Sequence, residues 1–86
     1  MNAPAPVIVH QPEKSRFICD TGVGEAEMTY RLMGTSVDFN HTYVPVAARG
    51  RGIAAVLVNT GLDWARSQGL SIKASCSYVR AHLRHA

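Results

Sequence analysis

The spacing of apolar residues first changes at Pro45, and this change separates the strands of the first half from the helix that follows them. Before Pro45, over 26–33 for example, apolar and polar side chains alternate, which is the period of a strand with one buried face. After it, over 52–68, apolar residues recur every three or four positions, which is the period of an amphipathic helix. The chain is therefore predicted to form a sheet first and a helix second.

Four strands are predicted before Pro45, because short segments that contain Gly, Pro or Ser separate four apolar runs. These strands cover 7–10, 16–20, 26–33 and 37–44. Strands joined by turns this short pair antiparallel. The last strand is unusually polar over 40–43, and we expect a β-bulge there that re-aims its side chains.

The helix over 52–68 is predicted to bury one stripe of side chains, formed by Ile53, Val56, Leu57, Thr60, Gly61, Trp64 and Ala65. Gly69 ends this helix, and a fifth strand over 70–74 and a short helix over 78–85 follow. A strand that follows a crossover helix in the same sheet lies parallel to the strand before the helix.

The predicted fold class is α+β, with a mostly antiparallel five-stranded sheet, a crossover helix after the fourth strand, a parallel fifth strand and a short C-terminal helix. The 86 residues, 1–86, are expected to form one domain, with 1–6 flexible. Val58 and Leu62 lie off the helix stripe, so they either pack beneath the short helix or form a dimer patch. The expected oligomeric state is therefore either a monomer or a weak dimer.

Composition excludes a disordered chain, because hydrophobic residues make up 47% and charged residues 17%. No apolar run approaches the roughly 20 residues of a membrane span, and 1–9 lacks the basic start of a signal peptide. Cys19 and Cys76 do not have the spacing of a metal site, and Cys19 is expected to be a small buried group. We therefore expect a cytoplasmic protein with no metal site and no membrane partner.

Charge is distributed unevenly along the chain, whose formal net charge is +3. The segment 1–48 has three Lys and Arg residues against five Asp and Glu residues, whereas 49–86 has six against Asp63 alone, so the two segments carry −2 and +5. A basic C-terminal half favours an anionic partner, although surface arginines also serve solubility alone.

The loop 49–55, Arg-Gly-Arg-Gly-Ile-Ala-Ala, lies between the last strand before Pro45 and the helix. At such a place the free N–H groups and the positive end of the helix dipole attract phosphate, and glycine lets the main chain approach it. Arg49 and Arg51 can add charge-assisted hydrogen bonds. A second interpretation is a strand-to-helix turn with no ligand, since glycine is common in tight turns.

Three phosphate-binding patterns can be compared with this loop. The Walker pattern fails, because no Gly-Lys-Ser/Thr occurs. The dinucleotide pattern GxGxxA matches, but no acidic residue follows Asp63 and the chain is too short for that fold. The pattern [Q/R]xxGx[G/A], matched over 49–54, has the right position between a bulged strand and an amphipathic helix.

From about Val7 to its C-terminus the chain resembles the minimal GNAT-like (GCN-related) N-acetyltransferases of roughly ninety residues, often called YjdJ-type. The resemblance rests on the order of five segments: His41-Thr42, Val44-Pro45, Arg49 to Ala54, Ala65-Arg66 with Gly69-Leu70, and Cys76-Ser77-Tyr78-Val79. It implies transfer of acetyl from acetyl-coenzyme A (acetyl-CoA) to an amine, which is a small molecule, a polyamine or a protein.

The resemblance also implies where acetyl-CoA binds. Its pyrophosphate would lie on the main-chain N–H groups of the loop, and its pantetheine arm in a wedge between the fourth and fifth strands. The implied cofactor-binding residues are Val44, Arg49, Gly50, Arg51, Gly52, Ile53, Ala54 and Ala55.

Three candidate catalytic residues follow from the same resemblance. Cys76 is placed beside the thioester, ahead of a helix N-terminus that lowers a thiol pKa, and it either accepts the acetyl group or only lines the pocket. Tyr78 either returns a proton to the coenzyme thiolate or is an ordinary packed ring. His41 either deprotonates the amine or is a hydrogen-bonded strand histidine.

One departure from the family pattern keeps two other functions in view. Many relatives have Glu after His-Thr, where this chain has Tyr43. If that Glu handles the acceptor, a non-catalytic acetyl-CoA-binding module is the alternative to an enzyme. Nucleic-acid binding through the basic half is a third possibility, but Trp64 lies on the buried stripe and offers no exposed platform for bases.

Overall fold

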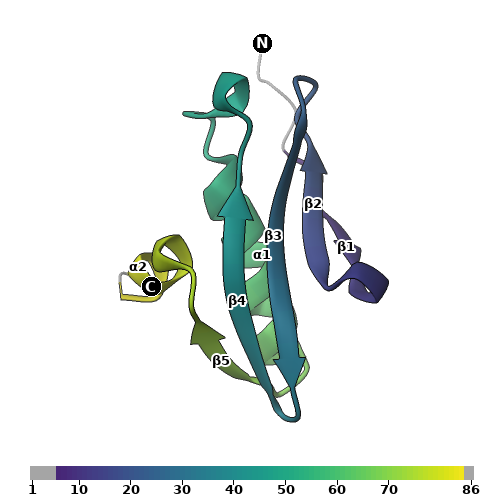
Figure 1. Cartoon of the computed structure of the whole chain (residues 1–86), viewed down its shortest axis with the longest axis vertical. Helices are drawn as coiled ribbons and strands as arrows, with labels where there is room; N and C mark the ends of the chain where they lie inside the picture. Colours follow the sequence, from purple (N-terminus) through teal and green to yellow (C-terminus); the bar gives the residue numbers. More distant parts are fainter. Residues whose placement is uncertain (1–5, 85–86) are drawn as a thin grey trace.

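The computed structural model describes residues 6–84, and its elements follow the predicted order. One sheet has the strand order β1-β2-β3-β4-β5, and two helices complete the fold (Figure 1). The elements are β1 (Val9–Gln11), β2 (Arg16–Asp20), β3 (Glu25–Met33), β4 (Ser36–Tyr43), α1 (Ile53–Ser67), β5 (Ser71–Ala74) and α2 (Ser77–Arg84). Neighbouring strands are antiparallel from β1 to β4, and β5 is parallel to β4. The predicted α+β fold class is confirmed.

The ends of several elements differ slightly from the prediction. The first strand begins at Val9 instead of Val7 and continues to Gln11, which pairs with Arg16. A short 3₁₀ turn, Pro12–Lys14, then reverses the chain, and a second one, Val46–Ala48, follows β4 where only a loop was expected. The predicted flexibility of 1–5 and the last residue of the predicted C-terminal helix lie outside the described residues.

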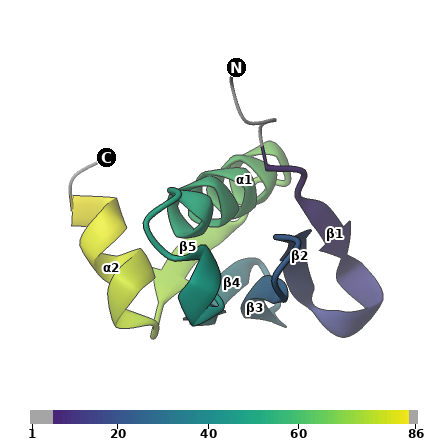
Figure 2. The same cartoon turned by 90° about the horizontal axis from the view of Figure 1, so that it is seen from above.

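The core lies between α1 and one face of the sheet (Figure 2). Phe17, Met28 and Phe39 are its largest fully buried sheet side chains. Cys19 is also buried, as expected for a small apolar group. Within 6–84, no helix covers the other face of the sheet, where ion pairs join Arg16 to Glu25 and Glu27.

Helix α1 is buried over a wider face than the predicted stripe. Val58 and Leu62 are buried in the same cluster as Val79 of α2, so they pack beneath that helix and are not an exposed dimer patch. Conversely, Trp64 is only half-buried at the edge of the stripe, as are Val56 and Thr60. The second helix explains the difference, because it covers a side of α1 that the spacing of apolar residues left unassigned.

The expected bulge is present in β4. His41 pairs with Thr29 and Phe39 pairs with Tyr30, so Asn40 is an extra residue that opposes no partner in β3. Pairing between β4 and β5 stops at the same point, since its last pair is Phe39 with Ala74. Beyond Phe39, β4 continues without β5, because β5 ends at Ala74 and the chain after it turns away into α2 (Figure 1).

Among residues 6–84, no helix is long and apolar enough to cross a membrane. Within the same residues, no group of three or more His, Cys, Asp or Glu side chains is close enough together to hold a metal ion.

Candidate functional site

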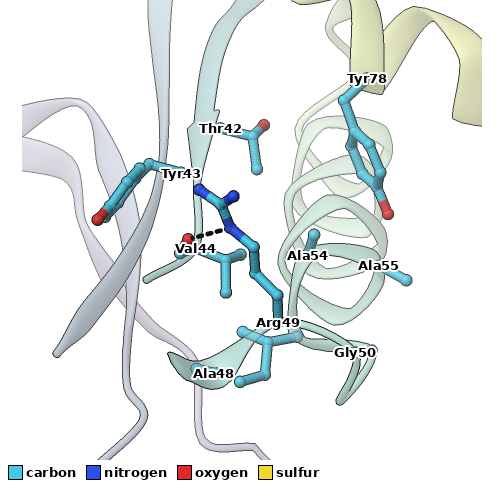
Figure 3. A pocket seen from close by; sticks show the side chains of 11 residues that line it. Thr42, Tyr43, Val44, Ala48, Arg49, Gly50, Ala54, Ala55 and Tyr78 are labelled. Carbon is cyan, nitrogen blue, oxygen red and sulfur yellow. Dashed lines mark hydrogen bonds between the residues drawn. The ribbon is translucent and has the colours of Figure 1, made fainter. Parts of the chain in front are cut away.

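A cavity of about 390 Å³ opens where β4 and β5 diverge. Its walls come from the end of β4, the segment that follows, the first turn of α1 and the first turn of α2 (Figure 3). The lining residues are Thr42, Tyr43, Val44, Ala48, Arg49, Gly50, Gly52, Ile53, Ala54, Ala55 and Tyr78. The cavity thus lies between the end of β4 and the first turn of α2, and no residue of β5 lines it, so the predicted wedge for the pantetheine arm between the fourth and fifth strands stays a prediction.

The loop that forms the floor of the cavity depends on two glycines. Gly50 has φ +87° and Gly52 has φ +78°, which are left-handed conformations that other residues rarely adopt. Gly52 is the N-cap residue of α1, and no side chain caps this end of the helix. The loop therefore presents bare main chain to the cavity.

The N–H groups of 50–55 donate no hydrogen bond to any acceptor within the described residues 6–84. The first helical N–H with an internal partner is that of Val56, which donates to the carbonyl oxygen of Gly52 at 3.2 Å. Free N–H groups and the positive end of the α1 dipole act together on an anion. This end of α1 is suited to a phosphate group.

The two arginines of the loop point in different directions. Arg49 lines the cavity, and its Nε donates to the carbonyl oxygen of Val44 at 2.9 Å (Figure 3). Arg51 is not a lining residue, and its Nη1 donates to the carbonyl oxygen of Thr21, in the turn between β2 and β3, at 3.3 Å. Only Arg49 places its guanidinium in the wedge.

Cys76 lies immediately behind the cavity wall without lining the cavity itself. The Sγ atom of Cys76 is 3.6 Å from Oγ1 of Thr42, and Thr42 does line the cavity. Cys76 directly precedes the first residue of α2. Burial alone would raise the pKa of the Cys76 thiol, but hydrogen bonds from the main chain at Val79 and Tyr78 and from Thr42 outweigh burial. The net effect lowers the pKa of Cys76 below its ordinary value of 9.0, which favours a reactive thiolate.

The turn that carries Cys76 is fixed by Asp38 of β4. The carboxylate of Asp38 accepts hydrogen bonds from the main-chain N–H of Ser75, at 2.7 Å, and from the Ser75 hydroxyl. The N–H of Cys76 itself donates to the carbonyl oxygen of Phe39 at 3.1 Å, which extends the main-chain hydrogen bonding of β4 beyond the end of β5. Sequence analysis gave Asp38 no role, because its partner is 37 residues away.

Tyr78 stands on the opposite wall from Arg49, on the first turn of α2 (Figure 3). Its side chain is 43% exposed, and its ring lies 6.5 Å from that of His82. The ring borders the cavity instead of packing into the core, which leaves its hydroxyl accessible to a ligand.

His41 lies away from the cavity. In the sheet it pairs with Thr29, whereas its neighbour Thr42 pairs with Met28, which is buried against α1. Alternation therefore directs Thr42 toward α1 and the cavity, and His41 toward the uncovered face of the sheet. Tyr43 follows His41 in pointing its ring away from the cavity (Figure 3).

The structure thus brings together most of the residues that the sequence singled out for binding. The side chain of Arg51 is separated from them. Two of the candidate catalytic residues are also outside the cavity: Cys76 lies behind the Thr42 side chain, and His41 lies on the opposite face of the sheet. Thr42, Tyr43 and Ala48 were missed as lining residues. For Thr42 a signal existed, because a bulge at Asn40 reverses which residues of the strand face α1.

Comparisons with known proteins agree with this architecture. A family model described as GCN5-related N-acetyltransferase matches residues 16–86. The solution structure of a GCN5-like protein from Staphylococcus aureus superimposes with a TM-score of 0.67 at 26% identity, over 92% of this chain and 78% of that one. A sheet of this order with a crossover helix between diverging strands is therefore an N-acetyltransferase-type fold.

Relatives in vertebrates are similar over a shorter stretch. Protein NATD1 of Homo sapiens and of Gallus gallus is 37% identical over 60 residues, and that of Xenopus tropicalis is 35% identical. The match covers 69% of this chain and 53–55% of those proteins, so the chain spans about half the length of the curated relatives it matches. Because the family model matches residues 16–86, the chain belongs to the GCN5-related N-acetyltransferase family.

Proposed function

We propose that the chain transfers an acetyl group from acetyl-CoA to an amine. One observation supports this most strongly: the N–H groups of 50–55 are without acceptors among the described residues and belong to a loop that lines a cavity. A pyrophosphate would satisfy several of these donors at once, as anions do at other helix N-termini. The family to which the chain belongs supports the choice of ligand.

The residues around the cavity fit the parts of acetyl-CoA. The first turn of α1 and Arg49 suit its phosphates, and Val44 and Thr42 follow in the direction of Cys76, where the thioester would lie. When bound, acetyl-CoA supplies an activated acetyl group as a thioester. Its acceptor is an amine, which is a small molecule, a polyamine or a protein, in the cytoplasm.

Cys76 has two possible parts in this reaction. As a nucleophile, its thiolate would attack the thioester carbonyl, so that a bond from Sγ to the acetyl carbon forms while the bond to the coenzyme sulfur breaks. Tyr78 is suited to give its hydroxyl proton to the departing coenzyme thiolate. The amine would then attack the acetylated Cys76, lose a proton and release the thiol. Alternatively, the amine attacks the thioester directly and Cys76 only helps to shape the thioester end of the cavity.

Backbone amide shifts measured during titration with acetyl-CoA test the binding step. We expect perturbation concentrated at residues 49–56, which include the free N–H groups of 50–55. The amide of Leu70, which already donates to the carbonyl oxygen of Ala65 at 3.0 Å, is an internal reference that should not move. No shift at 49–56 with millimolar acetyl-CoA rejects the proposal.

Mass spectrometry after mixing with acetyl-CoA tests the covalent route. A mass increase of one acetyl group that disappears in Cys76→Ala and persists in Cys19→Ala would support acetylation of Cys76. Cys19 is the matched control, because it is the other cysteine and is buried in the core. Product formation by Cys76→Ala at an unchanged rate would instead support direct transfer.

A second candidate function is binding of acetyl-CoA without catalysis. The observation in its favour is that His41 and the ring of Tyr43 both point away from the cavity, and that among residues 6–84 no His, Asp or Glu lines it. This function predicts the same amide shifts as the enzyme. It differs in giving no acetylated product with a panel of small amines, polyamines and lysine-containing peptides.

A further inference from the structure

Arg49 occupies a main-chain acceptor that a ligand in the wedge would need. Val44 is the first residue after β4, and its carbonyl oxygen accepts a hydrogen bond from Arg49 Nε at 2.9 Å. Figure 3 shows the Arg49 side chain running from the loop toward Thr42, with this hydrogen bond on the β4 side of the cavity. In this structure the arginine therefore blocks the acceptor that lies between the free N–H groups of the loop and Thr42.

Arg49 directly precedes residues 50–55, whose free N–H groups attract an anion. A charged donor bonds a phosphate oxygen more strongly than it bonds a neutral carbonyl, because both partners are then charged. Arg49 is exposed at the mouth of the wedge, so it has room to turn from one acceptor to the other. Binding of a phosphate at the loop is consequently expected to release the Val44 carbonyl oxygen from its hydrogen bond with Arg49.

We infer that Arg49 makes recognition depend on phosphate: it caps the Val44 carbonyl until a phosphate on the same ligand draws the guanidinium away. This inference rests on the proposed function. A ligand with only the amide-containing arm and the thioester must compete with Arg49 for Val44. A ligand that also carries a pyrophosphate removes that competitor, and its arm can then donate an N–H to the freed carbonyl. Arg49 thus selects coenzyme A thioesters over thioesters of similar shape that lack phosphate.

The affinities of Arg49→Ala for two thioesters should change in opposite directions. Its affinity for S-acetyl-pantetheine, which has no phosphate, should rise about fivefold, because the Val44 carbonyl no longer has an internal donor. Its affinity for acetyl-CoA should fall about tenfold, because a charge-assisted hydrogen bond is lost. Arg66→Ala is the control with the same loss of charge. Arg66 lies in the last turn of α1, where it pairs with Asp63, and it should leave both affinities within about twofold.

The free protein provides a test that needs no thioester. The Arg49 Nε–H should exchange with solvent more slowly than that of Arg66, whose side chain is 57% exposed. In Arg49→Ala the Val44 carbonyl carbon resonance should move, and millimolar inorganic pyrophosphate should move it in the same direction in the wild-type protein.

Three results would overturn the inference. The first is equal exchange of the two arginine Nε–H groups in the free protein. The second is an unchanged or lowered affinity of Arg49→Ala for S-acetyl-pantetheine while the wild type binds acetyl-CoA; the proposed function then survives alone. The third is no amide shift at 49–56 with acetyl-CoA in the wild type, which overturns the proposed function and this inference together.

Discussion

The two ends of α1 differ in how their main-chain groups are used. At the C-terminal end the chain satisfies itself: Gly69 donates to the carbonyl oxygen of Arg66 at 3.1 Å, and Leu70 donates to that of Ala65 at 3.0 Å. At the N-terminal end no side chain caps the helix, and the N–H groups of 50–55 have no acceptor among residues 6–84. The first end completes the fold, whereas the second is left available for a ligand.

Packing follows the same division. Near the C-terminal end, Trp64 meets an aromatic cluster in which its ring centroid lies 4.8 Å from that of His10, 5.7 Å from that of Phe17 and 4.9 Å from that of Tyr30. Near the N-terminal end, Ala54 and Ala55 border the cavity. Both halves of the helix contribute to the core, since Ile53, Leu57 and Val58 are buried as well, but the free main-chain groups and the cavity lie at the N-terminal end only. Substitutions at the two terminal glycines can therefore test whether ligand affinity depends on one end alone.

The largest effect is expected from Gly52→Asp, at the N-terminal end. A carboxylate a few ångströms from the bound pyrophosphate should weaken acetyl-CoA binding about 100-fold, the size expected for like charges near a protein surface. Gly52→Asn is the matched control, since Asn has the same shape, no charge and tolerance for a positive φ. Calorimetric titration of both variants measures the difference. Equal losses in the two would mean that conformation, and not charge, governs binding at this end.

An intermediate effect is expected from Gly69→Ala, at the C-terminal end. Gly69 has φ +69°, so a side chain there should lower the free energy of unfolding by about 1–2 kcal/mol, measured by urea denaturation. Acetyl-CoA affinity should stay within about twofold, because the altered hydrogen bonds lie at the far end of the helix. A loss of affinity as large as that of Gly52→Asn would contradict the separation of the two ends.

The smallest effect concerns His10 in the aromatic cluster. His10 stacks on Phe17, and its Nε2 lies 2.7 Å from the Tyr30 hydroxyl. Burial lowers the pKa of His10 below its ordinary 6.5, and the negative charge of Glu13 only partly opposes this. Protonation therefore favours the unfolded chain, and the free energy of unfolding should decrease as the pH falls below 6.5, until the folded-state pKa is passed.

Denaturation curves of the wild type and of His10→Phe between pH 7.5 and about pH 5 measure this contribution. The variant should lose the part of the pH dependence that belongs to His10, although it also loses the hydrogen bond with Tyr30 at every pH. Acetyl-CoA affinity at a fixed pH should not differ between them. A pH dependence that is identical in both proteins would show that burial of His10 does not affect its titration.

Much of the fold could be predicted from the sequence, because each element has a local signal. The change of period at Pro45 separates sheet from helix, Gly69 marks the end of α1, and the polar segment after Phe39 indicates the bulge. The burial of Val58 and Leu62 could not be predicted, since it depends on where α2 packs after the chain has turned.

The main-chain conformation of the candidate site could be predicted from the sequence, but the positions of its side chains could be predicted much less well. The glycines of the loop determine its main-chain conformation locally, so the phosphate-binding prediction depends on few residues. Arg49 and Arg51 are alike in sequence, but the acceptor of each is a carbonyl made available by the tertiary fold, at Val44 and at Thr21. No local pattern distinguishes them.

The bulge at Asn40 has a consequence for how the cavity could be altered by deletion. Phe39 and Thr42 face α1 although two residues separate them, which a regular strand of even and odd positions would not allow. Deleting Asn40 would therefore keep the inward and outward sides of every later residue while straightening the strand. The neighbouring strand could then continue its ladder of hydrogen bonds past Phe39, and the space between them would close. We therefore expect deletion of Asn40 to narrow the entrance to the cavity without changing any lining side chain.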